Sequence, residues 1–141
     1  MAEMISPERV RKYKEENPDS VVVAYINTTA ALKAECDVCV TSSSALKIVE
    51  KIEAPEILFI PDKNLGTCVK NAFPEKNIVV WDGYCPIHDR VTAEDILEAK
   101  KAHPEALVAV HPECKKEVVD LCDMAGSTAD IIKFSLNSDK D

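Results

Sequence analysis

A cysteine and a histidine stand three residues apart in the segment Trp81-Asp82-Gly83-Tyr84-Cys85-Pro86-Ile87-His88. The apolar run 78–81 predicts a buried strand that ends at Gly83, and a new helix signal begins at Thr92. The thiol and the imidazole are therefore expected on a loop at the end of a strand, where open α/β sheets bind ligands. A thiolate in this position suits a metal ion or an iron–sulfur cluster.

A second pair of reactive side chains, His111 and Glu113, follows the apolar run 107–110. Two residues apart in an extended chain, they point the same way and can act as acid and base on one substrate. Tyr25 and Asn27 end the run 21–26 in the same manner and offer a hydroxyl and an amide. The simpler interpretation makes all of them ordinary polar strand ends.

Hydroxyl groups precede two predicted helices, in Thr41-Ser42-Ser43-Ser44 and in Gly126-Ser127-Thr128. The backbone N–H groups of a helix N-terminus, together with hydroxyls, bind carboxylate or phosphate. As plain helix caps the same residues need no ligand. The sequence has no GxGxxG motif and no P-loop.

The elements that position these side chains alternate between strands and helices. The patterns predict strands at 21–26, 37–40, 57–60, 78–81 and 107–110, and helices at 7–16, 29–34, 45–51, 64–72, 92–102 and 115–122, with a weak segment up to Phe134. Ser6 and Asn64 are predicted N-caps, and Thr92 with Asp95 forms a predicted capping box. This alternation predicts an α/β fold of three αβα layers around a parallel sheet.

The chain also resembles itself when it is shifted by 86 residues. Ser6-Pro7-Glu8 then falls on Thr92-Ala93-Glu94, Asp37 on Asp123, and Thr41-Ser42 on Ser127-Thr128. The repeat predicts a complete αβα unit at 1–85 and a shortened one at 86–141, as if cut from a longer pseudo-symmetric protein. Each unit of such a protein would supply one cysteine like Cys85 to a shared metal or cluster. The alternative is a finished small protein.

Composition narrows the classes of function. The formal net charge of −8 over 141 residues argues against a nucleic-acid surface, and no apolar stretch is long enough to cross a membrane. The N-terminus is not that of a signal peptide, so six cysteines indicate a reducing, cytoplasmic compartment.

Cys36 and Cys39 form a CxxC that suits a redox pair, half a zinc site, or small apolar packing around Asp37. Cys68, Cys114 and Cys122 are interpreted as packing residues.

Several stretches resemble the quinolinate synthase (NadA) family and occur in the family's order, at 1–4, 23–28, 37–42, 61–66, 81–88, 110–114 and 126–128. The resemblance implies three pseudo-symmetric αβα subdomains around one [4Fe-4S] cluster, which is held by one cysteine from each. It implies a transferase of NAD biosynthesis that condenses iminoaspartate with dihydroxyacetone phosphate. The upstream supplier would be L-aspartate oxidase or aspartate dehydrogenase.

Carried over by motif, the resemblance makes Cys85 the middle cluster ligand, and Glu113, His111 and Tyr25 the catalytic residues. The substrate-binding residues it implies are Tyr25, Ile26, Asn27, Ser42, His88, His111, Pro112, Glu113, Ser127 and Thr128. With one of three cluster ligands, the chain alone is expected neither to hold a stable cluster nor to turn over.

Two other functions fit the residues. One is a zinc-binding module that uses Cys85, His88, His111 and Cys114, and the other is a purely structural or interaction fragment.

Overall fold

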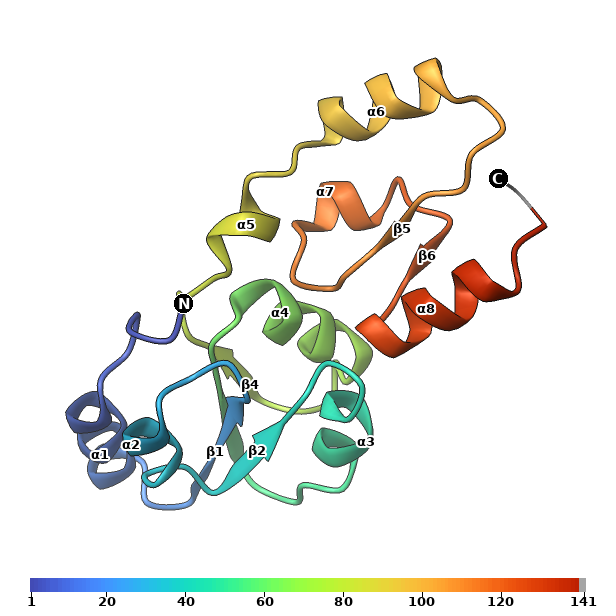
Figure 1. The fold of residues 1–141 in the computed structure, drawn as a ribbon. Helices are drawn as coiled ribbons and strands as arrows, with labels where there is room; N and C mark the ends of the chain where they lie inside the picture. The colour runs from blue at the N-terminus through green and yellow to red at the C-terminus, as the bar shows by residue number, and fades with distance from the viewer. Residues whose placement is uncertain (140–141) are drawn as a thin grey trace. The chain divides into compact units, whose positions relative to one another are not determined.

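The computed structural model describes residues 1–139 of the chain. They divide into two compact units, one formed by Met1–Tyr84 and the other beginning at Cys85. Each unit contains parallel strands connected through helices (Figure 1).

The first unit contains a parallel sheet with the strand order β2-β1-β3-β4. Its strands are β1 (Ser20–Tyr25), β2 (Val38–Val40), β3 (Glu56–Ile60) and β4 (Ile78–Val80). Val23 of β1 lies opposite Val38 on one side and opposite Phe59 on the other. The strands lie where the apolar runs predicted them, and the parallel α/β sheet is confirmed.

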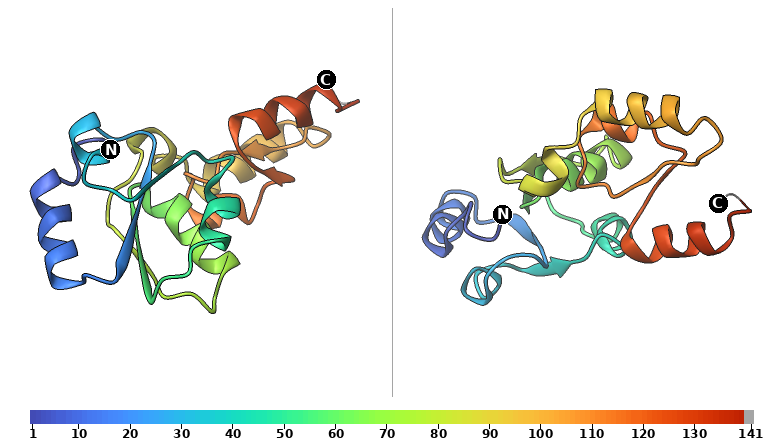
Figure 2. Two further views of the ribbon diagram at one scale, coloured as in Figure 1. Left: turned by 90° about the horizontal axis from the view of Figure 1, so that it is seen from below. Right: turned by 45° about the horizontal axis from the view of Figure 1, so that its top comes forward.

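Helices cover both faces of this sheet (Figure 2). Successive apolar side chains of the central strands point to opposite faces, so each face needs a helical cover. Val22 and Ala24 face α1 (Pro7–Glu16) and α2 (Ala30–Lys33), and Val23 faces α3 (Ala45–Glu50) and α4 (Lys63–Ala72). The buried apolar side chains of the helices on the two faces are Val10, Leu32, Ala45, Val49, Leu65 and Val69. The result is a three-layer αβα arrangement with an aliphatic core.

The start of α4 differs from the prediction. Asn64 was expected to cap this helix, but it is the helix's second residue. The N-cap is Asp62, whose fully buried Oδ1 accepts hydrogen bonds from the backbone N–H groups of Asn64 at 2.7 Å and Leu65 at 3.0 Å. A carboxylate at this position satisfies two of the open N–H groups of the first turn.

The second unit contains a two-stranded parallel sheet of β5 (Ala109–Val110) and β6 (Met124–Ala125). Its helices are α5 (Pro86–Asp89), α6 (Ala93–Ala102), α7 (Lys116–Val119) and α8 (Thr128–Leu136). The predicted capping box of Thr92 and Asp95 is confirmed. Val110, Cys114 and Val118 form the buried core of this unit.

Several predictions for the second unit were wrong. His88 lies in the short helix α5 rather than in a loop, because Pro86 at the first helical position favours helix. By contrast, the helix predicted after Gly126-Ser127-Thr128 is confirmed as α8, which begins with a Ser127–Asp130 capping box. The strand predicted at 107–110 and the helix predicted at 115–122 are both shorter than expected.

The offset of 86 residues recurs in the contacts of the two units. Asp37 Oδ2 accepts a hydrogen bond from the backbone N–H of Val22, and Asp123 Oδ2 accepts one from Val108, both at 2.8 Å. Lys14 lies 2.6 Å from Asp37, and its equivalent Lys100 lies 3.6 Å from Asp123. The strand registers match as well, since Ala24 pairs with Cys39 and Val110 with Ala125.

The helices within residues 1–139 include none with the length and apolar character that a membrane span requires.

Candidate functional site

The second unit brings together one ligand atom each from Cys85, His88 and Glu113, all within 4.8 Å of one another. Cys85 is the N-cap of α5 and His88 lies three residues later, so both side chains project from the same side of this helix. A hydrogen bond from the Asp89 N–H to the Cys85 carbonyl, 2.9 Å long, fixes the turn. Glu113 comes from the turn that follows β5.

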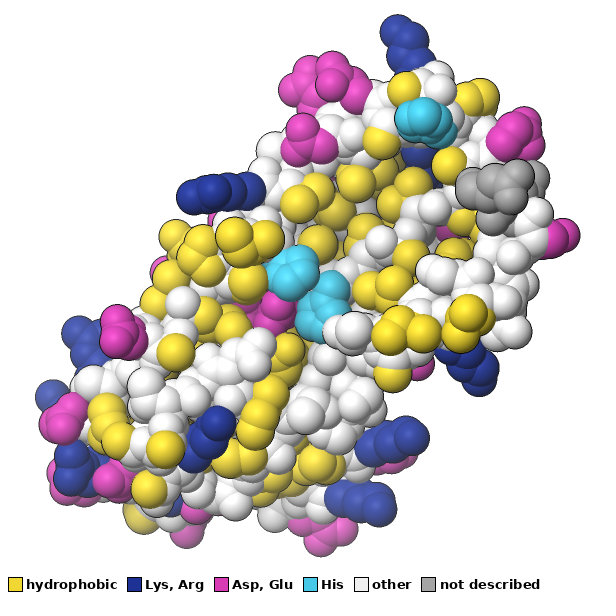
Figure 3. Space-filling model, viewed as in Figure 1, with side chains coloured by type: hydrophobic (Ala, Val, Ile, Leu, Met, Phe, Trp, Pro, Cys, Tyr) yellow, Lys and Arg dark blue, Asp and Glu magenta, His cyan; other side chains and the backbone are white. Residues whose placement is uncertain are grey.

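The Glu113 carboxylate lies close to two imidazoles. Its Oε2 is 2.8 Å from Nδ1 of His88 and 3.7 Å from Nδ1 of His111, and the residue is only 3% exposed. The two imidazole rings stack, with their centroids 5.2 Å apart. Figure 3 shows two adjoining histidine side chains beside acidic atoms, in agreement with these distances. The predicted acid–base pair of His111 and Glu113 is therefore close together, with His88 as a third member.

The surroundings of His111 favour its neutral form. Burial first, and the neighbouring His88 second, lower the pKa of His111 below its ordinary value of 6.5. Its Nδ1 accepts a hydrogen bond from the backbone N–H of Glu113 at 3.3 Å. A neutral ring that accepts at Nδ1 carries its proton on Nε2. His111 therefore presents a neutral N–H donor.

In the first unit the predicted substrate residues follow the carboxyl ends of β1 and β2. Tyr25 is 5% exposed and packs in the core, whereas Ile26 and Asn27 are exposed. Ser42 lies two residues beyond β2. The hydroxyls of Thr41, Ser43 and Ser44 hydrogen-bond among themselves, and Ser44 makes no side-chain cap of α3.

Ser127 and Thr128 occupy the corresponding place after β6. The Ser127 hydroxyl donates to Asp130 Oδ2 at 2.6 Å and accepts from the Asp130 N–H at 3.3 Å. It is buried, and both bonds belong to the helix cap. Thr128 is exposed at the first position of α8, where its side chain is accessible.

The zinc set expected from the sequence needs a correction. Cys114 packs in the apolar core with Val110 and Val118, and it is not a member of the group of potential metal ligands. His111 is not a member of this group either, and Glu113 completes it with Cys85 and His88. Within the described part of the chain, Cys85, His88 and Glu113 are the one group of three such residues that could hold a metal ion.

None of the six cysteines, all of which lie within the described residues, is in a disulfide. Burial above all, then the neighbouring Cys39 and Asp37, raises the pKa of the Cys36 thiol to about 11. Its Sγ also donates to the Leu32 carbonyl at 3.1 Å. A thiol that resists ionisation is a poor nucleophile and a poor ligand, so Cys36 suits packing better than redox chemistry, whereas Cys39 is exposed.

One side chain of this group, the Cys85 thiol, is of the type that binds an iron–sulfur cluster. Clusters are held by cysteine thiolates, and Cys85 is the sole thiol of this group within residues 1–139. His88 and Glu113 are instead donors of the kind that zinc accepts together with a thiolate.

The fold and this group define a parallel α/β protein with a cysteine, a histidine and a glutamate that could together hold a metal ion. The family model "Quinolinate synthetase A protein" matches residues 1–141. The chain is 54% identical over 138 residues to the quinolinate synthase of Clostridioides difficile (strain 630), covering 98% of the chain and 45% of that protein.

The quinolinate synthase of Aquifex aeolicus (strain VF5) is 48% identical over 139 residues, covering 99% of the chain and 43% of that protein. The chain therefore spans about half the length of the curated relatives it matches. It belongs to the quinolinate synthetase A protein family.

Proposed function

We propose that these residues serve a quinolinate synthase, which condenses iminoaspartate with dihydroxyacetone phosphate to quinolinate in NAD biosynthesis. The observation that carries the proposal is the convergence of Cys85, His88 and Glu113 in a chain of this family. The substrates are small anions, and an aspartate-oxidising enzyme, L-aspartate oxidase or aspartate dehydrogenase, supplies the imine. A cytoplasmic location accords with cysteines that form no disulfides among the described residues.

The proposed reaction needs proton transfers, and two residues of the group are suited to them. Glu113, buried 2.8 Å from His88, exchanges protons with the condensing carbon skeleton as phosphate and water leave. His111 donates a hydrogen bond from Nε2 to a substrate oxygen, because its Nδ1 is already occupied. A [4Fe-4S] cluster bound through Cys85 supplies a Lewis-acidic iron when it is present.

The remaining predicted residues bind and orient the substrates. Tyr25, Ile26 and Asn27 follow β1, and Pro112 lies between the two polar residues that follow β5. Thr128 is the first residue of α8, where backbone N–H groups attract carboxylate and phosphate, and Ser42 lies two residues before the N-cap of α3. Ser127 fixes the start of α8, and so the position of Thr128, as the N-cap of this helix.

The test is anaerobic reconstitution with iron and sulfide, followed by chromatographic measurement of quinolinate from the two substrates. A chain of the relatives' length that carries these residues is expected to form quinolinate, and its Cys85→Ala variant to form none. The 141-residue chain alone is expected to be inactive. Full activity of the Cys85→Ala variant, with Cys68→Ala as the matched control, would overturn the proposal.

A second candidate function is a mononuclear zinc module built on Cys85, His88 and Glu113. It is favoured by the close approach of three different donor types. Titration of the 141-residue chain with Zn²⁺ separates the two functions. Stoichiometric binding that is lost in His88→Ala but kept in Cys114→Ala, without iron uptake by a longer chain, would support the zinc module instead.

A further inference from the structure

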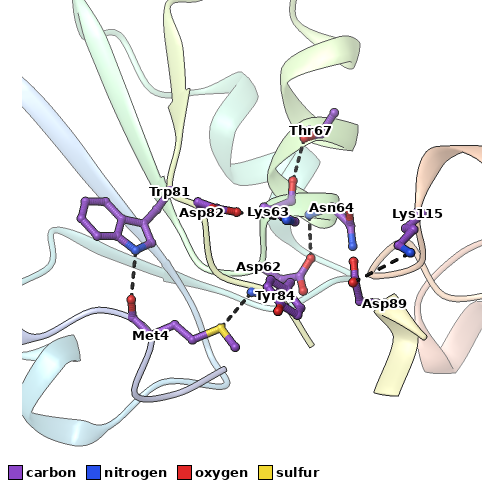
Figure 4. A network of polar contacts seen from close by, with 10 residues as sticks. All are labelled: Met4, Asp62, Lys63, Asn64, Thr67, Trp81, Asp82, Tyr84, Asp89 and Lys115. Carbon is purple, nitrogen blue, oxygen red and sulfur yellow. Dashed lines mark hydrogen bonds and ion pairs between the residues drawn. The ribbon is translucent and has the colours of Figure 1, made fainter. Parts of the chain in front are cut away.

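Lys63, the first residue of α4, contacts the three residues that stand immediately before Cys85. Its backbone N–H donates to the Gly83 carbonyl, and its Nζ lies 3.0 Å from Asp82 Oδ1. The same ammonium lies 4.6 Å from the centre of the Tyr84 ring, within the range of a cation–π interaction. Lys63 therefore contacts each of residues 82–84. Figure 4 shows it together with Asp82 and Tyr84.

The position of Lys63 is itself well defined. Asp62, fully buried, caps the helix one residue earlier and fixes the direction of the first turn. The Thr67 hydroxyl donates to the Lys63 carbonyl at 2.7 Å, one turn into α4. Lys63 thus extends from a rigid helix start toward the 82–84 segment.

The N-terminal segment holds the same stretch from another direction. The Met4 carbonyl accepts a hydrogen bond from Trp81 Nε1 at 3.1 Å, and the Met4 sulfur accepts one from the Tyr84 N–H at 3.2 Å. A Cβ added at Gly83 would lie 2.8 Å from Pro61 Cβ and 3.3 Å from Met4 Cβ. Only a glycine permits this close approach, so residues 81–84 are confined by Lys63 and Met4 together.

We propose that Lys63 is a positioning residue, which fixes the backbone of residues 82–84 and thereby limits the motion of Cys85, the next residue of the chain. The role in cluster retention rests on the proposed function, whereas the restraint on Cys85 does not. The ion pair with Asp82 is largely exposed, so alone it contributes little. The contact with the Tyr84 ring adds a second interaction through the same charge.

The restraint is tested on Cys85 in the 141-residue chain without iron. The rate at which N-ethylmaleimide alkylates Cys85 is followed by peptide mass spectrometry, with the exposed Cys68 of α4 as an internal reference. Lys63→Met keeps the stem and the backbone bond but loses the charge. It is expected to speed alkylation of Cys85 by about three- to tenfold, the effect of losing two weak interactions.

Two further variants separate positioning from general destabilisation. Lys63→Arg retains the charge and is expected to restore the slow rate, and Lys70→Met, in the last turn of the same helix, is expected to change nothing. An unchanged Cys85 rate in Lys63→Met, an equal increase at Cys68, or failure of Lys63→Arg to rescue would overturn the inference.

The consequence for the cluster is measured in a chain of the relatives' length. Release of iron to a chelator is expected to be several-fold faster in Lys63→Met than in Lys70→Met. If the unsubstituted chain takes up no iron while the alkylation rates change as expected, the proposed function fails and the restraint stands. If the cluster forms and Lys63→Met alters neither rate, the inference fails and the proposed function stands.

Discussion

Substitution of Asp37 tests the pseudo-symmetry on which the expectation of one cysteine per unit depends. Its carboxylate accepts a hydrogen bond from the N–H of Val22, a residue with no exposed surface, and lies 2.6 Å from the Lys14 ammonium. A hydrogen bond to a charged group contributes about 1.5–3 kcal/mol. The ion pair adds at most ~1 kcal/mol, because both side chains are 36% exposed. After allowance for solvent screening, Asp37→Ala is expected to lower the free energy of unfolding by ~2 kcal/mol.

Urea denaturation measures this loss. Asp37→Asn keeps an acceptor oxygen for Val22 but loses the charge, so about half of the effect is expected to remain. Asp123→Ala should act in the same direction through the N–H of Val108. A change below ~0.5 kcal/mol in Asp37→Ala, which is the range of ordinary surface substitutions, would refute the structural role of this carboxylate.

The same residue makes a prediction about acid stability. Burial raises the pKa of Asp37, but the bonds from Lys14 and Val22 outweigh it and hold the pKa below the ordinary value of 3.8. The unfolded chain therefore takes up the proton first as the pH falls. The stabilisation by Asp37 is complete at a pH above the pKa of its carboxyl in the unfolded chain. It is lost as the pH falls through the pKa of that carboxyl in the folded chain. The difference in stability between the unsubstituted chain and Asp37→Asn should shrink below about pH 4.

Three further predictions concern the site and the two cores. Glu113→Gln is expected to weaken Zn²⁺ binding at least about tenfold in calorimetry, because a buried anionic donor is lost, whereas the exposed Glu117→Gln should bind normally. Gly83→Ala should cost about 1–3 kcal/mol in urea unfolding, since its Cβ would meet Pro61, and unchanged stability would contradict this packing. Val118→Ala should destabilise the second unit by about 2 kcal/mol, visible as a selective loss of hydrogen-exchange protection there, and uniform protection would contradict it.

The first unit could be predicted well because its apolar runs are long and β-branched. The run at 57–60 became a central strand, buried on both faces, and the runs before Asn27 and Asp82 also became strands. The second unit was harder. Met124 and Ala125 form a two-residue strand that carries too little pattern to recognise alone, although the repeat maps it onto β2.

Two features could not be predicted from sequence alone: the residue that caps α4, and the membership of the Cys85, His88 and Glu113 group. Asn64 and Asp62 are both good caps, and only the packed end of β3 shows that Asp62 occupies that place. Cys114 and Glu113 are neighbours in sequence, and their different surroundings become visible once the turn after β5 is formed. The contacts of Lys63 with residues 82–84 join segments about 20 residues apart, which no local pattern reveals.

The most direct test of the account is the iron and sulfide content of a chain of the relatives' length, purified without oxygen, with and without Cys85→Ala. The account predicts about four irons and four sulfides per chain in the unsubstituted protein, and loss of both in the variant, while Cys36→Ala retains them. A Cys85→Ala variant that keeps a full cluster would contradict the assignment of Cys85 as a ligand.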